Sequence, residues 1–257
     1  MLLLVDIGNT HTHVGLQHDG QILRHHDLPT SGWDSGAMEI ELERFVGNDA
    51  DQIRGAAFCS VVPRTTPAAI AYLKRFRKAV QLTHQTVVGV GIDYPQPATI
   101  GADRLANAVA AKARFGAPAV VVDFGTAVTF DVVNSSGNYV GGIIAPGLSA
   151  MTDYLHEKTA LLPRIQIRDI DKAIGKSTEE AMLIGAVHGY RGLVKELILE
   201  LKSELNTTNL PVIATGGYAA LLASRMPEIT AVDPFLTLEG LRLVWESRFN
   251  SPSLAPR

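Results

Sequence analysis

The 257-residue chain has a single cysteine, Cys59, so it can form neither an internal disulfide nor a zinc site of several cysteines. It has no apolar run near the ~20 residues needed to cross a bilayer. Its first residues reach Asp6 without the basic segment that begins a signal peptide. We therefore expect a cytoplasmic protein with no membrane partner.

Positive charge is not in excess either. Lys and Arg number 23 against 26 Asp and Glu, which gives a net charge of −3 and a pI near 6.2. Such a chain presents no basic field to a nucleic-acid backbone, so no nucleic-acid partner is expected. An anionic substrate would have to be bound by local donors, arginines and cations. A hydrophobic content of 46% indicates a folded globular protein, of one large domain or two modest ones.

What the chain does contain is a glycine-bearing acidic hairpin at 120–132. The β-branched run 120–122 predicts a buried strand, and alternating apolar residues after the turn predict its antiparallel partner. Gly125 would let backbone N–H groups approach a phosphate, Asp123 could hold a cation, and Thr126 could donate to a phosphate oxygen. Hairpins without any ligand use the same residue types, so this stretch alone does not decide its function.

The same pattern occurs near the N-terminus at a constant offset of 117 residues (123 − 6, 125 − 8 and 137 − 20). The matching pairs are Asp6 with Asp123, Gly8 with Gly125, Thr12 with Thr129, and Gly20 with Gly137. A repeated unit predicts two similar halves, which we divide near Gly116-Ala117-Pro118 into domains 1–117 and 118–257. We expect an α/β fold in which both hairpins hold the phosphates of a nucleotide in a cleft between the halves. The alternative is two ordinary hairpins of a duplicated scaffold.

Periodicity and turn residues predict the remaining elements. Strands are expected at 2–7, 12–17, 21–25, 55–62, 139–148 and 211–214, and helices at 36–46, 68–76, 105–115, 149–161, 178–205, 218–226 and 237–249. The stretch 86–101 is predicted to be a binding loop, because it is long and has little regular structure of its own.

The tetrad Gly101-Ala102-Asp103-Arg104 stands between that loop and an Ala-rich helix. One interpretation makes Asp103 an N-cap and Arg104 a residue of the first turn. The other makes Asp103 a carboxylate that accepts a proton and Arg104 a guanidinium that binds an acid. The residues alone leave both open.

Other features also carry two interpretations. Ser177 and Glu180 form a capping box, so the hydroxyl of Thr178, the first helical residue, could face solvent or a substrate. Two glycines at 216–217 could lie against adenine or form a bare turn. His11 and His13 share a strand face and could bind metal or be a plain polar face, and no third ligand is suggested by spacing.

Three glycines within the long helix, at 185, 189 and 192, recur three or four residues apart. One helix face can therefore pack very closely against a neighbour. That neighbour could be a second subunit.

Five motifs in a fixed order resemble type III pantothenate kinase, a family of the actin-like ATPase and sugar-kinase superfamily, from residue 2 to about residue 246. They are Asp6-x-Gly8-Asn9-Thr10, Ser60-Val61-Val62-Pro63, Gly101-Ala102-Asp103-Arg104, Asp123-Phe124-Gly125-Thr126-Ala127 and Thr215-Gly216-Gly217. The first motif is shared widely in the superfamily. The motif at 101–104 combined with the motif at 123–127 is much more specific to the family. The resemblance implies two ribonuclease-H-like (actin-like ATPase) domains with nucleotide between them, and a homodimer. It also implies transfer of the ATP γ-phosphate to the primary hydroxyl of pantothenate, the first step towards coenzyme A.

The resemblance further implies roles for single residues. Asp103 would be the general base, and pantothenate would be bound by Tyr94, Gly101, Ala102, Asp103, Arg104 and Thr178. ATP would be bound by Asp6, Ile7, Gly8, Asn9, Thr10, His11, Thr12, His13 and Thr126. Asp6 would lie on the side of Mg²⁺, and Asp123 would bind the monovalent cation, K⁺ or NH₄⁺. Val128 departs from the family pattern, because many relatives carry Thr there; we expect it to affect only fine positioning.

Two other functions compete with this one. The first is a kinase of the same superfamily that acts on another small hydroxylated substrate. The tetrad at 101–104 disfavours this function. The second is a non-catalytic nucleotide-binding accessory protein on the same scaffold. A pure binder has no need of Asp103, so the presence of this third acid disfavours it.

Overall fold

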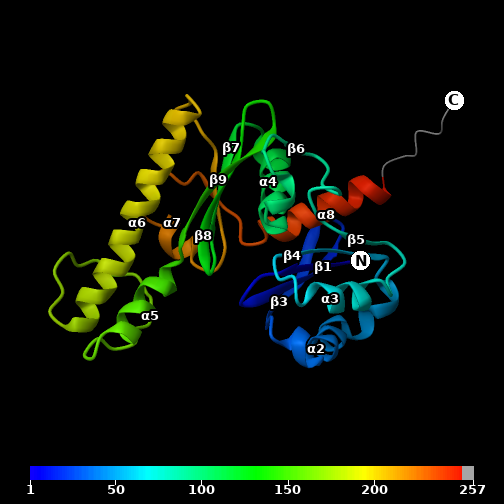
Figure 1. Cartoon of the computed structure of the whole chain (residues 1–257), viewed down its shortest axis with the longest axis horizontal. Coiled ribbons are helices and arrows are strands. Elements are labelled where there is room, and N and C mark those ends of the chain that lie inside the picture. The colour runs from blue at the N-terminus through cyan, green and yellow to red at the C-terminus, as the bar shows by residue number, and fades with distance from the viewer. Residues whose placement is uncertain (251–257) are drawn as a thin grey trace. The chain divides into compact units, whose positions relative to one another are not determined.

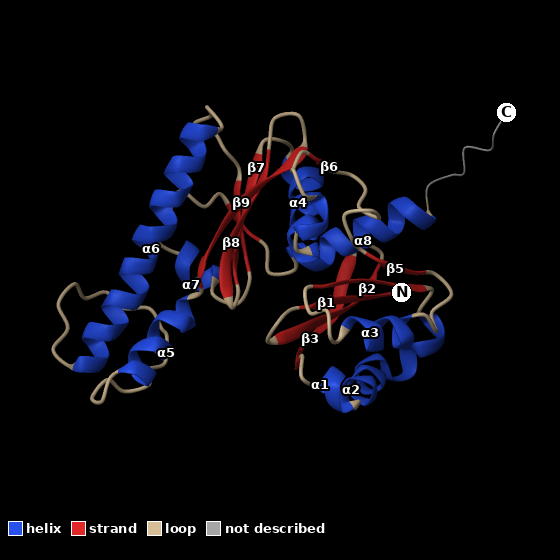
Figure 2. Ribbon diagram, viewed as in Figure 1, coloured by secondary structure: helices blue, strands red, loops and turns tan. Residues whose placement is uncertain are grey.

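The computed structural model describes residues 1–250, which pack into two compact units, each with its own sheet (Figures 1 and 2). Unit 1 comprises Met1–Arg114, Gly137–Tyr139 and residues 235–250, and unit 2 comprises Phe115–Ser136 and Val140–Pro234. The division of the sequence into 1–117 and 118–257 stays a prediction. The last helix belongs to the same unit as the N-terminal part of the chain.

Unit 1 is built on a five-stranded sheet in the order β3-β2-β1-β4-β5. Its strands are β1 Leu2–Ile7, β2 His11–His18, β3 Gln21–Pro29, β4 Gly55–Ser60 and β5 Ala79–Gln81. The first three strands form an antiparallel meander, and β4 and β5 continue the sheet parallel to β1. A short strand, β6 (Gly91–Ile92), pairs in parallel with Asn138–Tyr139, where β9 begins.

Helices cover both faces of this sheet (Figure 1). They are α1 Gly32–Ser35, α2 Ala37–Val46, α3 Thr66–Leu73 and α8 Leu236–Phe249. Unit 1 also contains α4 Ala102–Phe115 and 3₁₀ turns at Gly47–Gln52 and Pro97–Thr99. One layer of the core joins alternate residues of β1 to α1, α2 and α3, and includes Val5, Trp33 and Leu42. On the other face α8 contacts β1 and β4. It also crosses α4 so closely that a Cβ at Gly240 would lie 2.0 Å from the Ala106 carbonyl oxygen.

The second sheet is mixed and has the order β11-β10-β7-β8-β9-β6, and most of its strands belong to unit 2. Its elements are β7 Ala119–Phe124, β8 Ala127–Val133, β9 Asn138–Pro146, α5 Leu148–Lys158, α6 Thr178–Glu204, β10 Val212–Thr215, α7 Ala219–Ala223 and β11 Ala231–Val232. Apolar residues on one face of β7, β8 and β10 pack against α5, α6 and α7, with Phe124, Phe130 and Tyr190 among the largest buried side chains. Within the described residues no helix combines the length and apolarity needed to cross a membrane.

The predicted strands and helices occur in the predicted order, with differences at their ends. Helix α4 begins at Ala102, three residues early, because the Gly101 carbonyl accepts from the N–H groups of Arg104 (3.1 Å) and Leu105 (3.3 Å). Asp103 therefore lies inside the first turn, and its interpretation as an N-cap was wrong. Ser177 does cap α6, since its hydroxyl accepts from the Glu180 N–H at 3.1 Å. The Glu180 carboxylate, however, accepts from the Lys176 N–H, one residue before the position of a standard capping box.

The repeated hairpin is present in both units, but the two turns differ by one residue. Asp6 pairs with His13 in the first hairpin, whereas Asp123 pairs with Thr129 in the second. The N–H of Gly8 donates to the carbonyl three residues on (His11, 3.0 Å), and that of Gly125 to the carbonyl two residues on (Ala127, 3.1 Å). A shift of one residue exchanges the two faces of a strand.

Candidate functional site

The turn of the first hairpin is the exposed end of an otherwise buried pair of strands. Asn9, Thr10 and His11 are exposed, and Gly8 is half-buried. Ile7 and Thr12, which flank the turn, have side chains in the core, so only their backbone groups remain to meet a ligand. The predicted contacts of this stretch with ATP stay predictions.

Asp6 is a buried carboxylate, 9% exposed, at the end of β1. Its neighbour in the parallel strand β4 is Cys59, whose thiol donates to Oδ1 of Asp6 at 3.1 Å. Burial raises the pKa of Asp6, and the charge of His13 and the thiol hydrogen bond oppose this in part. Burial also raises the pKa of Cys59 well above its usual value, and the carboxylates of Asp6 and Asp103 raise it further. Asp6 and Asp103, the two acids of unit 1 with predicted site roles, therefore both raise the pKa of this thiol.

The residues predicted to bind pantothenate lie at or near the start of α4, except Thr178, which begins α6. Asp103 accepts from the Arg104 N–H through Oδ1 at 2.8 Å. The Arg104 guanidinium lies over the ring of Tyr139, with 5.8 Å between its Cζ and the ring centroid. The ring of Tyr94 lies 6.3 Å from the same tyrosine. A side chain at Gly101 would displace the Asp103 carboxylate, since a Cβ would lie 2.5 Å from Oδ1 of Asp103.

The two histidines of β2 form a polar strand face. Nδ1 of His13 lies 2.7 Å from Oδ1 of Asp27 on β3, and the His11 and His13 rings are 6.3 Å apart. Among residues 1–250, no group of three or more His, Cys, Asp or Glu side chains is arranged to hold a metal ion. Within the part of the chain that the structure describes, these histidines therefore belong to no such cluster.

In unit 2, Asp123 lies between two glycine turns. It pairs in parallel with Thr215, so the turn after β10 comes directly beside it. A Cβ at Gly216 would lie 2.6 Å from Oδ1 of Asp123, and one at Gly125 would lie 3.7 Å from the same atom. Thr126, at the tip of the hairpin, is exposed. Carboxylate and backbone carbonyl oxygens are the types of ligand that bind hard cations.

Tyr218 follows the Gly216-Gly217 turn and fixes its surroundings. Its hydroxyl lies 2.9 Å from that of Ser149, near the start of α5. A surface pocket of about 380 Å³ opens beside this pair and is also lined by Arg164 and Gln166. The pocket therefore adjoins the turn that was predicted either to meet adenine or to be bare.

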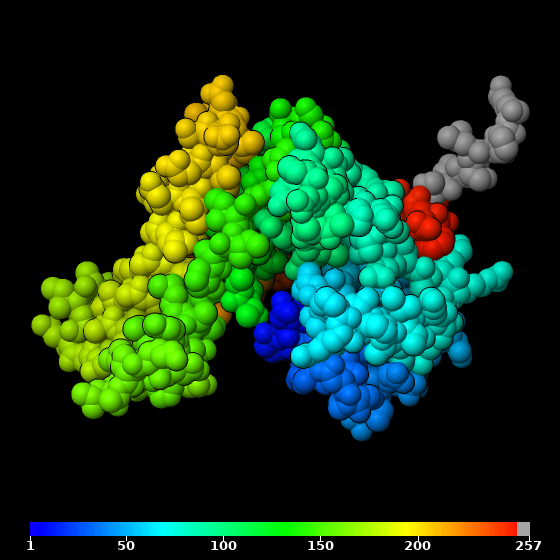
Figure 3. Space-filling view, in the orientation of Figure 1, coloured from blue at the N-terminus to red at the C-terminus, as the bar shows by residue number. Residues whose placement is uncertain are grey.

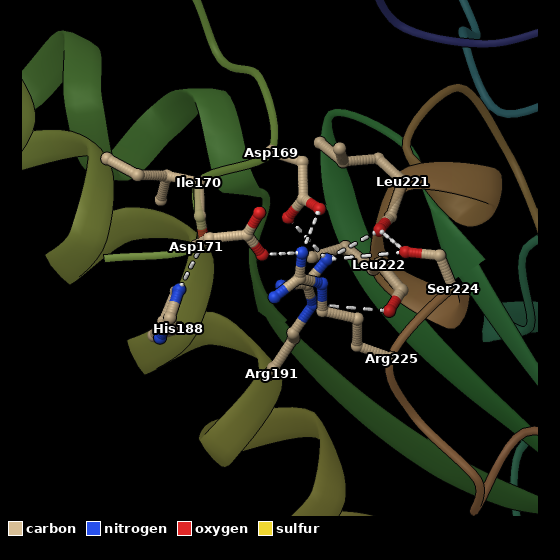
Figure 4. A network of polar contacts seen from close by, with 9 residues as sticks. All are labelled: Asp169, Ile170, Asp171, His188, Arg191, Leu221, Leu222, Ser224 and Arg225. Atoms are coloured by element: carbon tan, nitrogen blue, oxygen red, sulfur yellow. Dashed lines mark hydrogen bonds and ion pairs between the residues drawn. The ribbon is translucent and has the colours of Figure 1, made fainter. Parts of the chain in front are cut away.

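Thr178 is exposed at the start of α6 and follows a segment, 159–177, without helix or strand. This segment is nevertheless anchored, as Figure 4 shows: the nearly buried Arg191 donates to Asp169 at 3.1 Å and to the carbonyl of Leu221 at 2.7 Å. A second arginine, Arg225, pairs with Asp169 at 3.0 Å and also with Asp171.

The same anchor includes Ile170, whose side chain is buried against Leu183 and Val187. Its carbonyl lies 2.8 Å from Nε2 of His188 (Figure 4). The segment that precedes Thr178 is thus held both by the middle of α6 and by the C-terminal end of α7. Helix α7 is the one that follows the glycine turn.

Known proteins resemble this chain over nearly its whole length. The family model described as type III pantothenate kinase matches residues 2–200. The chain is 47% identical over 241 residues to a type III pantothenate kinase of Akkermansia muciniphila, an alignment that covers 94% of this chain and 96% of that relative. The chain belongs to the type III pantothenate kinase family. Another member, from Methylacidiphilum infernorum, is 44% identical over 247 residues, covering 95% of this chain and 88% of its own.

Solved structures of proteins with low sequence identity to this chain share its fold. A putative 2-dehydro-3-deoxygalactonokinase of Sinorhizobium meliloti superposes with a TM-score of 0.60 at 14% identity, covering 100% of this chain and 99% of that one. A structure from Campylobacter jejuni, described as a putative Baf family transcriptional activator, gives 0.63 at 20% identity, with 96% and 99% covered. The predicted α/β fold of the actin-like ATPase and sugar-kinase superfamily is confirmed.

Three residues that contact the predicted site residues were not predicted from the sequence. They are Cys59, Tyr139 and Thr30. Local sequence patterns indicate only a strand residue at Cys59 and the start of a strand at Tyr139, and they assign no role to Thr30. For Cys59 the parallel register of β1 and β4 was the missing information. Tyr139 and Thr30 come from segments distant in sequence, and no local pattern indicates their partners.

Gly216→Ala should destabilise the protein by about 1–3 kcal/mol, because its φ of +87° disfavours a side chain and the new Cβ would meet Asp123. The matched control is Gly217→Ala, whose Cβ would meet nothing within 4 Å. Urea unfolding monitored by circular dichroism measures both. Equal stability of the two variants would show that Asp123 is not confined by the turn.

Asp6→Asn should raise stability at neutral pH in the absence of nucleotide and metal. The pKa of Asp6 is raised above its ordinary value of 3.8, so folding favours the protonated form. The contribution of Asp6 to stability is thus complete below about pH 3.8 and is lost as pH rises through the folded-state pKa. An amide keeps an oxygen for the Cys59 thiol and carries no charge.

The free energy of unfolding of both proteins is measured from about pH 4 to pH 8. The advantage of Asp6→Asn should be largest at the upper end and shrink towards acid. An advantage that does not change with pH would contradict the raised pKa.

Proposed function

We propose that this chain phosphorylates pantothenate with ATP to give 4'-phosphopantothenate, the first step of coenzyme A biosynthesis. The observation that carries the proposal is its membership of the type III pantothenate kinase family over most of its length, with matching names for its relatives. The geometry at the start of α4 supports it, because the Asp103 carboxylate is held by the Arg104 backbone N–H and the Arg104 guanidinium lies over the ring of Tyr139.

Asp103 is proposed as the general base that takes the proton from the attacking primary hydroxyl. Its Oδ1 is held by a backbone N–H, so the carboxylate has a defined orientation. A positioned base of this kind contributes roughly 10²–10⁴-fold. Arg104, turned over Tyr139, would bind the pantothenate carboxylate through two parallel hydrogen bonds. Tyr94, Gly101, Ala102 and Thr178 complete the proposed pantothenate contacts.

ATP is proposed to bind at both hairpin turns, through Asp6–His13 and Thr126. Phosphoryl transfer depends mainly on positioning and charge compensation, so an acidic protein must recruit cations. Mg²⁺ usually binds through one or two carboxylates together with substrate phosphates, which fits the absence of a three-residue cluster among residues 1–250. Asp6 would hold Mg²⁺ and Asp123 the monovalent cation, K⁺ or NH₄⁺. Both ions would neutralise charge on the phosphates.

A homodimer is proposed for the working enzyme, which we expect in the cytoplasm. Unit 2 has several large exposed apolar side chains on α5 and the segment after it, a region visible on the surface in Figure 3. They include Tyr154, Leu161 and Ile174, which are 62%, 90% and 73% exposed. Gly185, Gly189 and Gly192 are exposed as well, so a second chain can approach the α6 backbone closely.

The decisive assay measures ADP release from ATP with pantothenate, with and without K⁺. Turnover is expected only when pantothenate and K⁺ are both present. Turnover with a different hydroxylated substrate would favour another kinase of the superfamily, and ATP binding without turnover would favour an accessory protein.

Within that assay, Asp103→Asn should lower kcat by roughly 10²–10⁴-fold and leave the fold intact, because the amide oxygen can still accept from the Arg104 N–H. Asp51→Asn, at an exposed position in a 3₁₀ turn, is the control and should keep full activity. Near-normal turnover of Asp103→Asn would refute the assignment of the base.

Gly189→Leu should convert the dimer to a monomer, which light scattering coupled to size-exclusion chromatography detects. Within the chain an added Cβ at Gly189 meets nothing within 4 Å, so the monomer fold should tolerate the change. Lys202→Leu, on another face of the same helix, is the control and should remain dimeric. If Gly189→Leu stays dimeric, this face of α6 is not the interface.

A further inference from the structure

Thr30 lies directly beneath the turn of the first hairpin. It follows β3 and is 1% exposed. Its hydroxyl lies 2.7 Å from the Gly8 carbonyl oxygen and donates to it. Its N–H donates to the Thr10 carbonyl at 3.0 Å. One residue therefore holds the two carbonyls on either side of Asn9.

The Thr30 hydroxyl also belongs to a buried chain of hydrogen bonds. It lies 3.1 Å from the hydroxyl of Thr12, and the indole N–H of Trp33 donates to that hydroxyl at 3.2 Å. Thr12 and Trp33 are 0% and 5% exposed. All members come from unit 1, and neither the predicted base nor the predicted pantothenate residues take part.

The direction of this chain follows from the chemistry of its two ends. An indole N–H can only donate, and a backbone carbonyl can only accept. The Thr30 hydroxyl donates its only proton to the Gly8 carbonyl oxygen. In the contact between the two hydroxyls, Thr12 must therefore be the donor and Thr30 the acceptor. The order is therefore Trp33 to Thr12 to Thr30 to the Gly8 carbonyl, with every hydroxyl donating once and accepting once.

This arrangement orients the turn. In a trans peptide the C=O and the following N–H point in opposite directions. With the Gly8 carbonyl held towards the interior, the N–H of Asn9 is directed to the opposite side, where Asn9 itself is exposed. Backbone N–H groups held in this way bind anions without reorganising.

We propose that Thr30 is a positioning residue for phosphate binding: it fixes the peptide between Gly8 and Asn9 so that the turn is ready to receive the phosphates of the nucleotide. The inference rests on the proposed function, because it takes the nucleotide to be ATP. Thr30 does not touch the ligand and acts through Gly8.

The test compares Thr30→Val with Thr30→Ser. Valine keeps the shape but removes the donor to Gly8, and serine keeps the donor. Thr30→Val should raise the KM for ATP about tenfold, as expected for about 1.4 kcal/mol of lost binding. The KM for pantothenate should be unchanged, and Thr30→Ser should stay within about twofold of the native enzyme.

Thr65→Val is the matched control. Thr65 is equally buried at 1% exposed, and its hydroxyl donates to the Val62 carbonyl at 3.1 Å in the same unit. It should lower Tm without changing the KM for ATP. If Thr30→Val behaves in the same way, with a lower Tm and an unchanged KM for ATP, Thr30 is merely structural and the inference is overturned.

Calorimetric titration with Mg-ATP separates this inference from the proposed function. If the native protein binds ATP but does not turn over pantothenate, the proposed function fails, and weaker binding by Thr30→Val still supports the inference. Equal ATP affinity of the native protein and Thr30→Val would overturn it, as would an absence of ATP binding by the native protein.

Discussion

The burial of Asp6 at the end of β1 is the constraint on which much of unit 1 depends. A carboxylate in the interior is costly unless its surroundings compensate, and here one thiol hydrogen bond and the charge of His13 do so only in part. The Mg²⁺ proposed to bind at Asp6 would offset the remaining cost. The strands around it are correspondingly apolar: every residue from Leu2 to Ile7 is buried, so the sheet holds the acid rigidly.

The two hairpins have the same order of strands but differ in register by one residue. This difference changes which residues surround each turn. The longer first turn exposes three polar residues above a buried threonine network. The tighter second turn places Asp123 beside the Gly216 backbone instead. By strand pairing, the residue equivalent to Thr12 is Val128, because Ile7 faces the first and Phe124 the second. A hydroxyl in one core thus corresponds to an aliphatic side chain in the other.

Much of this could be predicted from the sequence because it rests on local patterns. Alternation gave the hairpin strands, and Ser177 with Glu180 marked the start of α6. The face on which Thr12 lies could not be predicted, since the constant offset of 117 (123 − 6) aligns it with Thr129, and only the register shows the shift by one residue. The place of Asp103 differs by two positions from the N-cap that one interpretation gave it, because Gly101 begins the helix through its carbonyl. The partners of Cys59 and Thr30 come from other strands, and one sequence carries no record of them.

The packing of α8 has a consequence for the order in which the protein acquires its structure. This helix covers β1 and β4, and Trp245 donates to the Lys78 carbonyl at 2.7 Å, so unit 1 is completed by residues far along the chain. Unit 2, by contrast, is drawn almost entirely from one stretch, Val140–Pro234 together with Phe115–Ser136. During translation, where domains generally fold as they emerge, the second sheet can therefore mature on the ribosome while the first-made strands still wait for their last covering helix.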